Sequence, residues 1–269
     1  EGKKLADIYG PENVYDFSLS NPSVPAPEQV KESIKKIVDT EDPLIIHGYM
    51  NNAGFEDVRD AISKSINKKY GTNFTQNNII MTVGAASGLN IIFKSILNPD
   101  EEVLTFAPYF VEYNSYVEGY NGVLKIVSPN LEIFEPNLKE LEDKITPKTR
   151  ALIINTPNNP TGVIYSEETI KKIAEILEKK QKEYNTQIFL VSDEPYRELA
   201  YDGIEVPYVT KYYKNTFVVY SFSKSLSLPG ERIGYVVVPS EMDDSENIIT
   251  AITIANRVIG SVNAPSLFQ

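Results

Sequence analysis

Short apolar runs alternate with helical patterns through most of the 269-residue sequence. This alternation is typical of α/β folds, in which helices cover a largely parallel sheet. Seven runs are predicted strands, at residues 79–83, 102–106, 123–127, 151–155, 188–192, 216–221 and 233–238. Apolar spacing predicts helices after Pro27 and at residues 55–70, 85–97, 110–119, 138–145 and 167–184. We therefore expect an α/β fold with a mostly parallel seven-stranded sheet and helices on both faces.

Charge and composition exclude several classes of function. The formal net charge is −11 and there is no basic run, so the surface repels phosphate backbones and we expect no nucleic-acid partner. The chain has no cysteine and a single histidine, His47, which argues against a metal site and leaves a Ser-His-Asp hydrolase little support. The absence of cysteine fits a cytoplasmic protein, and no apolar run is long enough to cross a bilayer.

Four polar clusters stand at the C-terminal ends of predicted strands, where open α/β sheets bind ligands. In the first, Gly84, Ala85 and Ala86 join a strand to a helix, so their free N–H groups could bind a phosphate. Tight packing of the helix on the sheet would also explain these small residues. The second is Asn158-Asn159-Pro160-Thr161-Gly162, which is either a surface turn or a source of amide donors for a phenolate oxygen.

The third and fourth clusters carry charge. Asp193 follows an apolar strand, so we expect it to be partly buried and to need a cationic partner, either a pyridinium nitrogen or Arg197. Lys224 follows another strand among hydroxyls and small residues, which favours a Schiff-base lysine over a solvated surface charge. Arg232, eight residues later, could bind a phosphate through its planar guanidinium.

The order and spacing of these clusters resemble the fold-type I enzymes that use pyridoxal 5′-phosphate (PLP), specifically class I/II aminotransferases of the aspartate aminotransferase kind. The most specific matches are Asn-Asn-Pro-Thr-Gly and the Ser-x-Ser-Lys segment with Arg232 beyond it, and the similarity runs from about Ser18 to Gln269. The resemblance implies a PLP-binding large domain at 41–240. Residues 1–40 would belong to the small domain or arm, and 241–269 would lead toward a C-terminal small domain that is largely missing, with its carboxylate-binding arginine.

The resemblance also implies roles for individual residues. Lys224, Asp193 and Tyr196 match the catalytic residues: the Schiff-base lysine, the partner of the pyridine nitrogen and, with Asn159, a ligand of the cofactor's 3′ oxygen. Ser221, Arg232 and the turn at Gly84, Ala85 and Ala86 match the phosphate site. Phe110 matches the aromatic that stacks on the ring, with Tyr109 as the alternative.

Two further matches concern the substrate and the partner subunit. Tyr49 resembles the tyrosine that reaches the phosphate of the neighbouring subunit, which implies a homodimer. Asn21 and Asn159 are expected to bind substrate, although Ser20 stands where the family often has glycine. The implied reaction moves an amino group from an L-amino acid to a 2-oxo acid such as 2-oxoglutarate. A C–S β-lyase, a non-catalytic PLP-binding module and a nucleotide-binding protein that uses the Gly84 loop remain alternatives.

Overall fold

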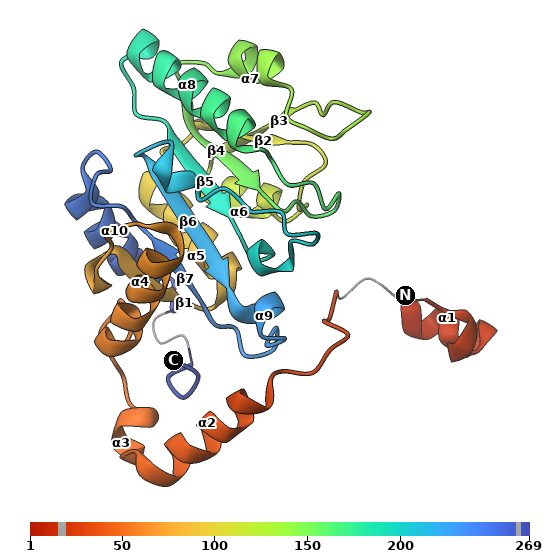
Figure 1. Cartoon of the computed structure of the whole chain (residues 1–269). Helices are drawn as coiled ribbons and strands as arrows, with labels where there is room; N and C mark the ends of the chain where they lie inside the picture. Colours follow the sequence, from red (N-terminus) through yellow and green to blue (C-terminus); the bar gives the residue numbers. More distant parts are fainter. Residues whose placement is uncertain (16–19, 262–264) are drawn as a thin grey trace.

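The computed structural model describes residues 1–15, 20–261 and 265–269 (Figure 1). Within them a seven-stranded sheet has the order β1-β7-β6-β5-β4-β2-β3. Its strands are β1 (Ile79–Thr82), β2 (Glu102–Phe106), β3 (Val123–Val127), β4 (Thr149–Asn155), β5 (Phe189–Asp193), β6 (Thr216–Ser221) and β7 (Gly234–Val237). Every predicted strand is present, to within two residues at each end, and all of them except the edge strand β3 are buried along most of their length.

The sheet is mostly parallel, as predicted. Strands β3, β2, β4, β5 and β6 pair in parallel, while β7 is antiparallel to both β6 and β1. A parallel crossover needs a connection that can span the sheet, usually with a helix. Between β6 and β7 the chain has only a short segment with the four-residue helix α9 (Phe222–Ser225), so it returns beside β6 in the opposite direction.

Helices cover both faces of the sheet, which confirms the predicted layers (Figure 1). Alternate strand residues point to opposite sides, so Val191 packs with the cluster around α5 (Gly84–Ile96) while Leu190 packs with the cluster around α8 (Glu167–Tyr184). The first face also carries α6 (Tyr113–Glu118) and α10 (Ser245–Val258), and the second carries α7 (Leu138–Lys144) and α4 (Glu56–Tyr70).

The remaining helices belong to the first 46 residues of the chain or are short 3₁₀ turns. They are α1 (Gly2–Tyr9), α2 (Glu28–Thr40), α3 (Pro43–Ile46) and the 3₁₀ turns Pro11–Asn13, Gln76–Asn78, Arg197–Leu199 and Val209–Lys211. Neither α1 nor α2 buries a residue within the described chain. No helix in the described ranges is both long and apolar enough to cross a membrane.

Strand direction decides where the polar clusters meet. Strands β1, β4, β5 and β6 run the same way, so their carboxyl ends lie along one edge of the sheet. Asp193 is itself the last residue of β5, where it pairs with Asn155 of β4 and Val219 of β6. The sequence placed it one residue after the strand. Because Asp193 pairs with a strand on each side, its backbone is fixed within the sheet.

Candidate active site

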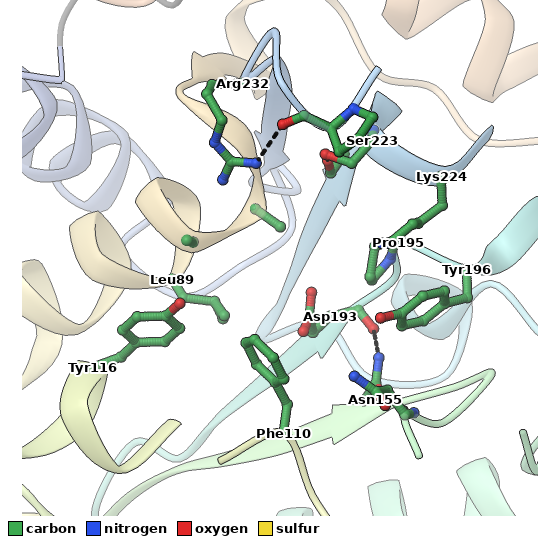
Figure 2. Close-up of a pocket in the computed structure, with 15 residues that line it drawn as sticks. Leu89, Phe110, Tyr116, Asn155, Asp193, Pro195, Tyr196, Ser223, Lys224 and Arg232 are labelled. Carbon is green, nitrogen blue, oxygen red and sulfur yellow. Dashed lines mark hydrogen bonds between the residues drawn. The ribbon is translucent and has the colours of Figure 1, made fainter. Parts of the chain in front are cut away.

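A cavity of about 250 Å³ opens at the carboxyl ends of β4, β5 and β6, beside the N-terminus of α5 (Figure 2). Nine residues predicted for the site line it: Ala85, Ala86, Phe110, Asn159, Asp193, Tyr196, Ser221, Lys224 and Arg232. They come from segments that lie far apart in the sequence, and the order of the strands brings them together.

Asp193 forms the floor of this cavity and is 5% exposed. Its Oδ2 accepts a hydrogen bond from the Tyr113 hydroxyl over 2.6 Å, whereas its buried Oδ1 has no partner among the described residues. Burial raises the pKa of Asp193 to about 7, although the bond from Tyr113 acts to lower it. A buried, unpaired carboxylate oxygen is costly unless a donor reaches it, so the site is suited to a cationic N–H group.

Arg197, the alternative partner of Asp193, bonds elsewhere. Its Nε donates to Glu194 Oε2 over 2.6 Å, in an ion pair whose two side chains are 4% and 1% exposed. Its two terminal nitrogens donate to the backbone carbonyls of Val206 and Pro207. Arg197 therefore anchors the loop after β5 and leaves Asp193 Oδ1 free.

Lys224 lies in α9, directly after β6. The Ser221 hydroxyl caps this helix by accepting from the backbone N–H of Ser223, and Lys224 Nζ donates to the backbone carbonyl of Ser20 over 2.7 Å. Burial lowers the pKa of the Lys224 amine, and the positive charge of Arg232 lowers it further. The amine is thus held at the cavity with its neutral, nucleophilic form made more accessible.

The start of α5 and Arg232 form a positively polarised end of the cavity. Gly84 has φ +72°, and a Cβ at this position would lie 2.8 Å from Arg232 Nη2. Glycine therefore allows both the left-handed backbone and the close approach of the guanidinium. Ala85 and Ala86 line the cavity at the N-terminus of a 13-residue helix, where backbone N–H groups and the helix dipole favour an anion.

Asn159 and Tyr196 lie together on the opposite wall. The pKa of Tyr196 is raised by burial and by the charge of Asp193, and a hydrogen bond with the Asn159 side chain opposes this shift. The backbone N–H of Asn159 donates to Asn155 Oδ1 over 2.6 Å, which fixes the turn that carries it. Together they offer a hydroxyl and an amide donor at one point of the cavity.

Phe110 supplies an apolar wall. Its ring lines the cavity (Figure 2). It also meets the Tyr113 ring edge-on, with 5.7 Å between ring centroids. Tyr109 instead stacks on Tyr113 at 6.4 Å and is not among the described residues that line the cavity. Of the two aromatic residues considered from the sequence, Phe110 is the one that lines the cavity in the described chain.

Besides Gly84, which lies at the start of α5, two predicted residues are not among the described residues that line this cavity. Tyr49 is 87% exposed and its ring faces the guanidinium of Arg257 at 5.9 Å, and Asn21 is also exposed. The predicted role of Tyr49 concerns a neighbouring subunit, and it stays a prediction. Ser20, beside Asn21, has φ +51°, the left-handed conformation that glycine adopts most easily.

Several cavity residues were missed by the sequence analysis: Leu89, Tyr116, Asn155, Pro195, Ser223 and Pro229. Asn155 carried a usable signal, because it is a polar residue that ends an apolar strand, as Asp193 does. Tyr113, which bonds Asp193 from outside the cavity, has the local sequence of a core aromatic and carried no such signal.

The comparisons with known proteins agree with this geometry. The family model described as aminotransferase class I and II matches residues 12–269. Aspartate aminotransferase of Pyrococcus horikoshii is 34% identical over 247 residues, which cover 91% of this chain and 61% of the relative. The chain spans about three-fifths of the length of the curated relatives it matches.

Solved structures give the same result. An amino transferase from Eubacterium rectale superimposes with a TM-score of 0.96 at 51% identity, covering 99% of this chain and 67% of that protein. Aspartate aminotransferase from Thermotoga maritima superimposes with a TM-score of 0.85 at 28% identity, covering 99% and 68%. The likeness therefore extends over the sheet, its helices and the cavity.

Proposed function

Because the chain belongs to the aminotransferase class I and II family, whose members use pyridoxal phosphate, we propose that it transfers an amino group from an L-amino acid to a 2-oxo acid, with 2-oxoglutarate as the acceptor. One observation carries the proposal. Lys224 and Asp193 line the same cavity although they lie far apart in the sequence, and Asp193 carries a buried carboxylate oxygen that has no partner among the described residues. This is the pair of groups that a PLP enzyme needs, one to hold the cofactor and one to support its ring nitrogen.

The residues present fit PLP. The unpaired Oδ1 of Asp193 suits a protonated ring nitrogen, and Phe110 offers a flat apolar contact. Arg232 with the start of α5 suits a phosphate, which needs several donors and a positive field. When bound, PLP supplies an electron sink for the charge that forms at the α carbon of the amino acid.

We assign roles to the residues of the cavity on this basis. Lys224 would hold the cofactor covalently through its amine and would move the proton at the substrate α carbon. Asp193 would keep the ring nitrogen charged, while Tyr196 and Asn159 would donate to the 3′ oxygen. The phosphate is bound by Gly84, Ala85, Ala86, Ser221 and Arg232, and substrate by Asn21 and Asn159.

The proposal extends to assembly and location. Tyr49 is exposed and carries a hydroxyl, so it is free to reach the phosphate bound by a second copy of the chain in a homodimer. The amino acid and the oxo acid are small soluble metabolites, which fits a cytoplasmic enzyme. Residues 41–240 would form the large domain and 1–40 the arm, consistent with the absence of buried residues in α1 and α2.

The test uses the full-length protein loaded with PLP. We expect L-aspartate and 2-oxoglutarate to yield L-glutamate, measured by coupled assay or mass spectrometry. Borohydride reduction should fix PLP on the peptide that contains Lys224. The Lys224→Ala variant should stay folded, by circular dichroism, yet lose both the activity and the fixed PLP.

Other outcomes would contradict the proposal. Release of pyruvate and ammonia from L-cysteine, without amino-group exchange, would identify a C–S β-lyase. PLP that attaches at Lys224 but exchanges no amino group with any L-amino acid would identify a binding module.

A further inference from the structure

Tyr113 holds the Asp193 carboxylate from outside the cavity. It is the first residue of α6 and is fully buried, and its hydroxyl donates to Asp193 Oδ2 over 2.6 Å. This is the one side-chain hydrogen bond of Asp193 in the described residues, and Oδ1 is left without a partner. The two oxygens of this carboxylate therefore differ, because Oδ2 accepts a hydrogen bond and the buried Oδ1 accepts none from the described residues.

The Tyr113 ring has little freedom to move. It stacks on Tyr109 with ring centroids 6.4 Å apart and meets the edge of Phe110 at 5.7 Å. Its backbone N–H donates to the carbonyl of Phe110 over 3.0 Å. The hydroxyl is therefore held in place by rings on either side, one of which also forms the apolar wall of the cavity.

Tyr113 also remains a donor over the ordinary pH range. Burial raises the pKa of its hydroxyl well above the usual value, and the negative charge of Asp193 raises it further. Since neither change in pH nor rotation of the ring removes the donor, Oδ2 of Asp193 stays occupied.

We propose that Tyr113 is a positioning residue for the cofactor: by occupying Oδ2, it orients the Asp193 carboxylate so that Oδ1 faces the ring nitrogen of PLP. This inference rests on the PLP site proposed above. Two consequences follow from the geometry. The carboxylate cannot rotate without breaking a charge-assisted hydrogen bond, and it is a weaker base because one lone pair is engaged.

The basicity matters for the proton on the ring nitrogen. Without the bond from Tyr113, the pKa of Asp193 would rise further, because burial would act unopposed by a hydrogen bond. A more basic carboxylate draws the shared proton away from the nitrogen and toward itself. Tyr113 therefore favours the charged state of the ring while touching neither the ring nor the substrate.

The experiment compares Tyr113→Phe with Tyr213→Phe in the full-length protein. Tyr213 is a matched control, since it is also buried and its hydroxyl also donates over 2.6 Å, to the carbonyl of Ile188 just before the opposite end of β5. PLP labelled with ¹⁵N at the ring nitrogen reports protonation by NMR. Equilibrium dialysis gives the PLP dissociation constant. Neither readout depends on turnover.

We expect Tyr113→Phe to weaken PLP binding by about tenfold, the typical effect of losing a hydrogen bond to a charged group. The ¹⁵N resonance should move toward the unprotonated value. Tyr213→Phe should lower the unfolding temperature by a similar amount yet leave both readouts unchanged. In an Asp193→Asn background, adding Tyr113→Phe should have little further effect on PLP binding, because the carboxylate it orients is gone.

Several results would overturn the inference. An unchanged ¹⁵N resonance and dissociation constant in folded Tyr113→Phe would leave Tyr113 a purely structural residue. Equal losses of PLP affinity in the parent and in the Asp193→Asn background would show that Tyr113 acts by another route. If the parent protein bound PLP but exchanged no amino groups, the proposed function would fail while this test kept its meaning. A parent that binds no PLP would overturn both.

Discussion

The side-chain amide of Asn155 joins β4 to the carboxyl end of β5. Its Nδ2 donates to the backbone carbonyl of Asp193 over 2.8 Å, and its Oδ1 accepts from the backbone N–H of Asn159 over 2.6 Å. Both neighbours are proposed cofactor ligands. A residue that no sequence motif identified therefore connects two of the polar clusters that build the cavity.

Replacing Asn155 with alanine should affect both stability and cofactor binding. The change leaves a buried carbonyl of Asp193 and a partly buried N–H of Asn159 without these partners, which costs about 1–3 kcal/mol in the free energy of unfolding. PLP should also bind more weakly, because the turn that carries Asn159 loses its anchor. Urea unfolding and equilibrium dialysis measure the two effects.

Asn78 gives the control for that variant. It is 2% exposed, and its Nδ2 donates to the backbone carbonyl of Val238 over 2.8 Å. This bond lies just before β1 and just after β7, at the edge of the sheet opposite to the cavity. Asn78→Ala should therefore destabilise the protein without changing the PLP dissociation constant. Equal changes in PLP affinity for both variants would show that Asn155 acts only through general stability.

Replacing Gly84 with alanine should separate backbone strain from the loss of the phosphate site. At φ +72° an alanine costs about 1–2 kcal/mol, and its Cβ would lie 2.8 Å from Arg232 Nη2, so the guanidinium must move. Gly203 has φ +72° as well, but nothing lies within 4 Å of a Cβ there. We expect both variants to lose similar stability in urea, and Gly84→Ala alone to bind PLP more weakly.

A PLP affinity that is equally unaffected in both glycine variants would remove Gly84 from the phosphate site. In that case the glycine would serve only the turn between β1 and α5.

The fold could be predicted from the sequence because each strand is a short apolar run bounded by polar or turn-forming residues, and most of these strands are buried on both faces. The runs that became β2, β3 and β6 were placed without error at either end. The direction of β7 could not be predicted, because an apolar run of that length fits a parallel or an antiparallel neighbour equally well. Direction follows from the length of the connection and from packing against β1, which are properties of the whole sheet.

The cavity residues with reactive or charged side chains at strand ends could be predicted from the sequence. The residues that support them through tertiary contacts could not. Asp193 ends β5, Lys224 follows β6 and Arg232 precedes the antiparallel β7, so the topology of the sheet brings all three to one edge. Tyr113 lies 80 residues from Asp193, and nothing in its local sequence distinguishes it from a core aromatic. Its contact depends on how α6 packs against β5, which no local pattern encodes.

The ion pair of Glu194 and Arg197 should be a large contributor to the stability of the loop that carries Tyr196. Both side chains are buried, so Arg197→Met leaves an uncompensated carboxylate and should lower the free energy of unfolding by about 3–5 kcal/mol. The pair of Lys31 and Glu28 has the same spacing of three residues, but its side chains are 61% and 64% exposed. Lys31→Met should cost less than about 1 kcal/mol.

A double change, Glu194→Gln with Arg197→Met, should regain part of the stability, because the unpaired charge is removed as well. If Arg197→Met cost no more than Lys31→Met in urea unfolding, the pair would not be holding this loop.

The pH dependence of stability gives a test of Asp193 that needs no cofactor. In the folded protein its pKa is raised to about 7, while in the unfolded chain an aspartate titrates near its ordinary value of about 4. Between these two values the folded state binds the extra proton, so the contribution of this group to stability is present below about pH 4 and is lost as the pH rises through about 7. Asp193→Asn removes the titration. Measured by urea unfolding without PLP, the variant should gain stability relative to the parent, on the order of 1 kcal/mol or more, between about pH 5 and about pH 8.

Asp243 provides the contrast, because hydrogen bonds from Lys214 and Asn215 lower its pKa. Its contribution to stability is lost only at acid pH, as the pH falls through that lowered value, so the difference between Asp243→Asn and the parent should stay constant from about pH 5 to about pH 8. A constant difference for Asp193→Asn as well would mean that its carboxyl titrates at an ordinary pKa. The buried, unpaired oxygen proposed to meet the ring nitrogen would then be hydrated in solution.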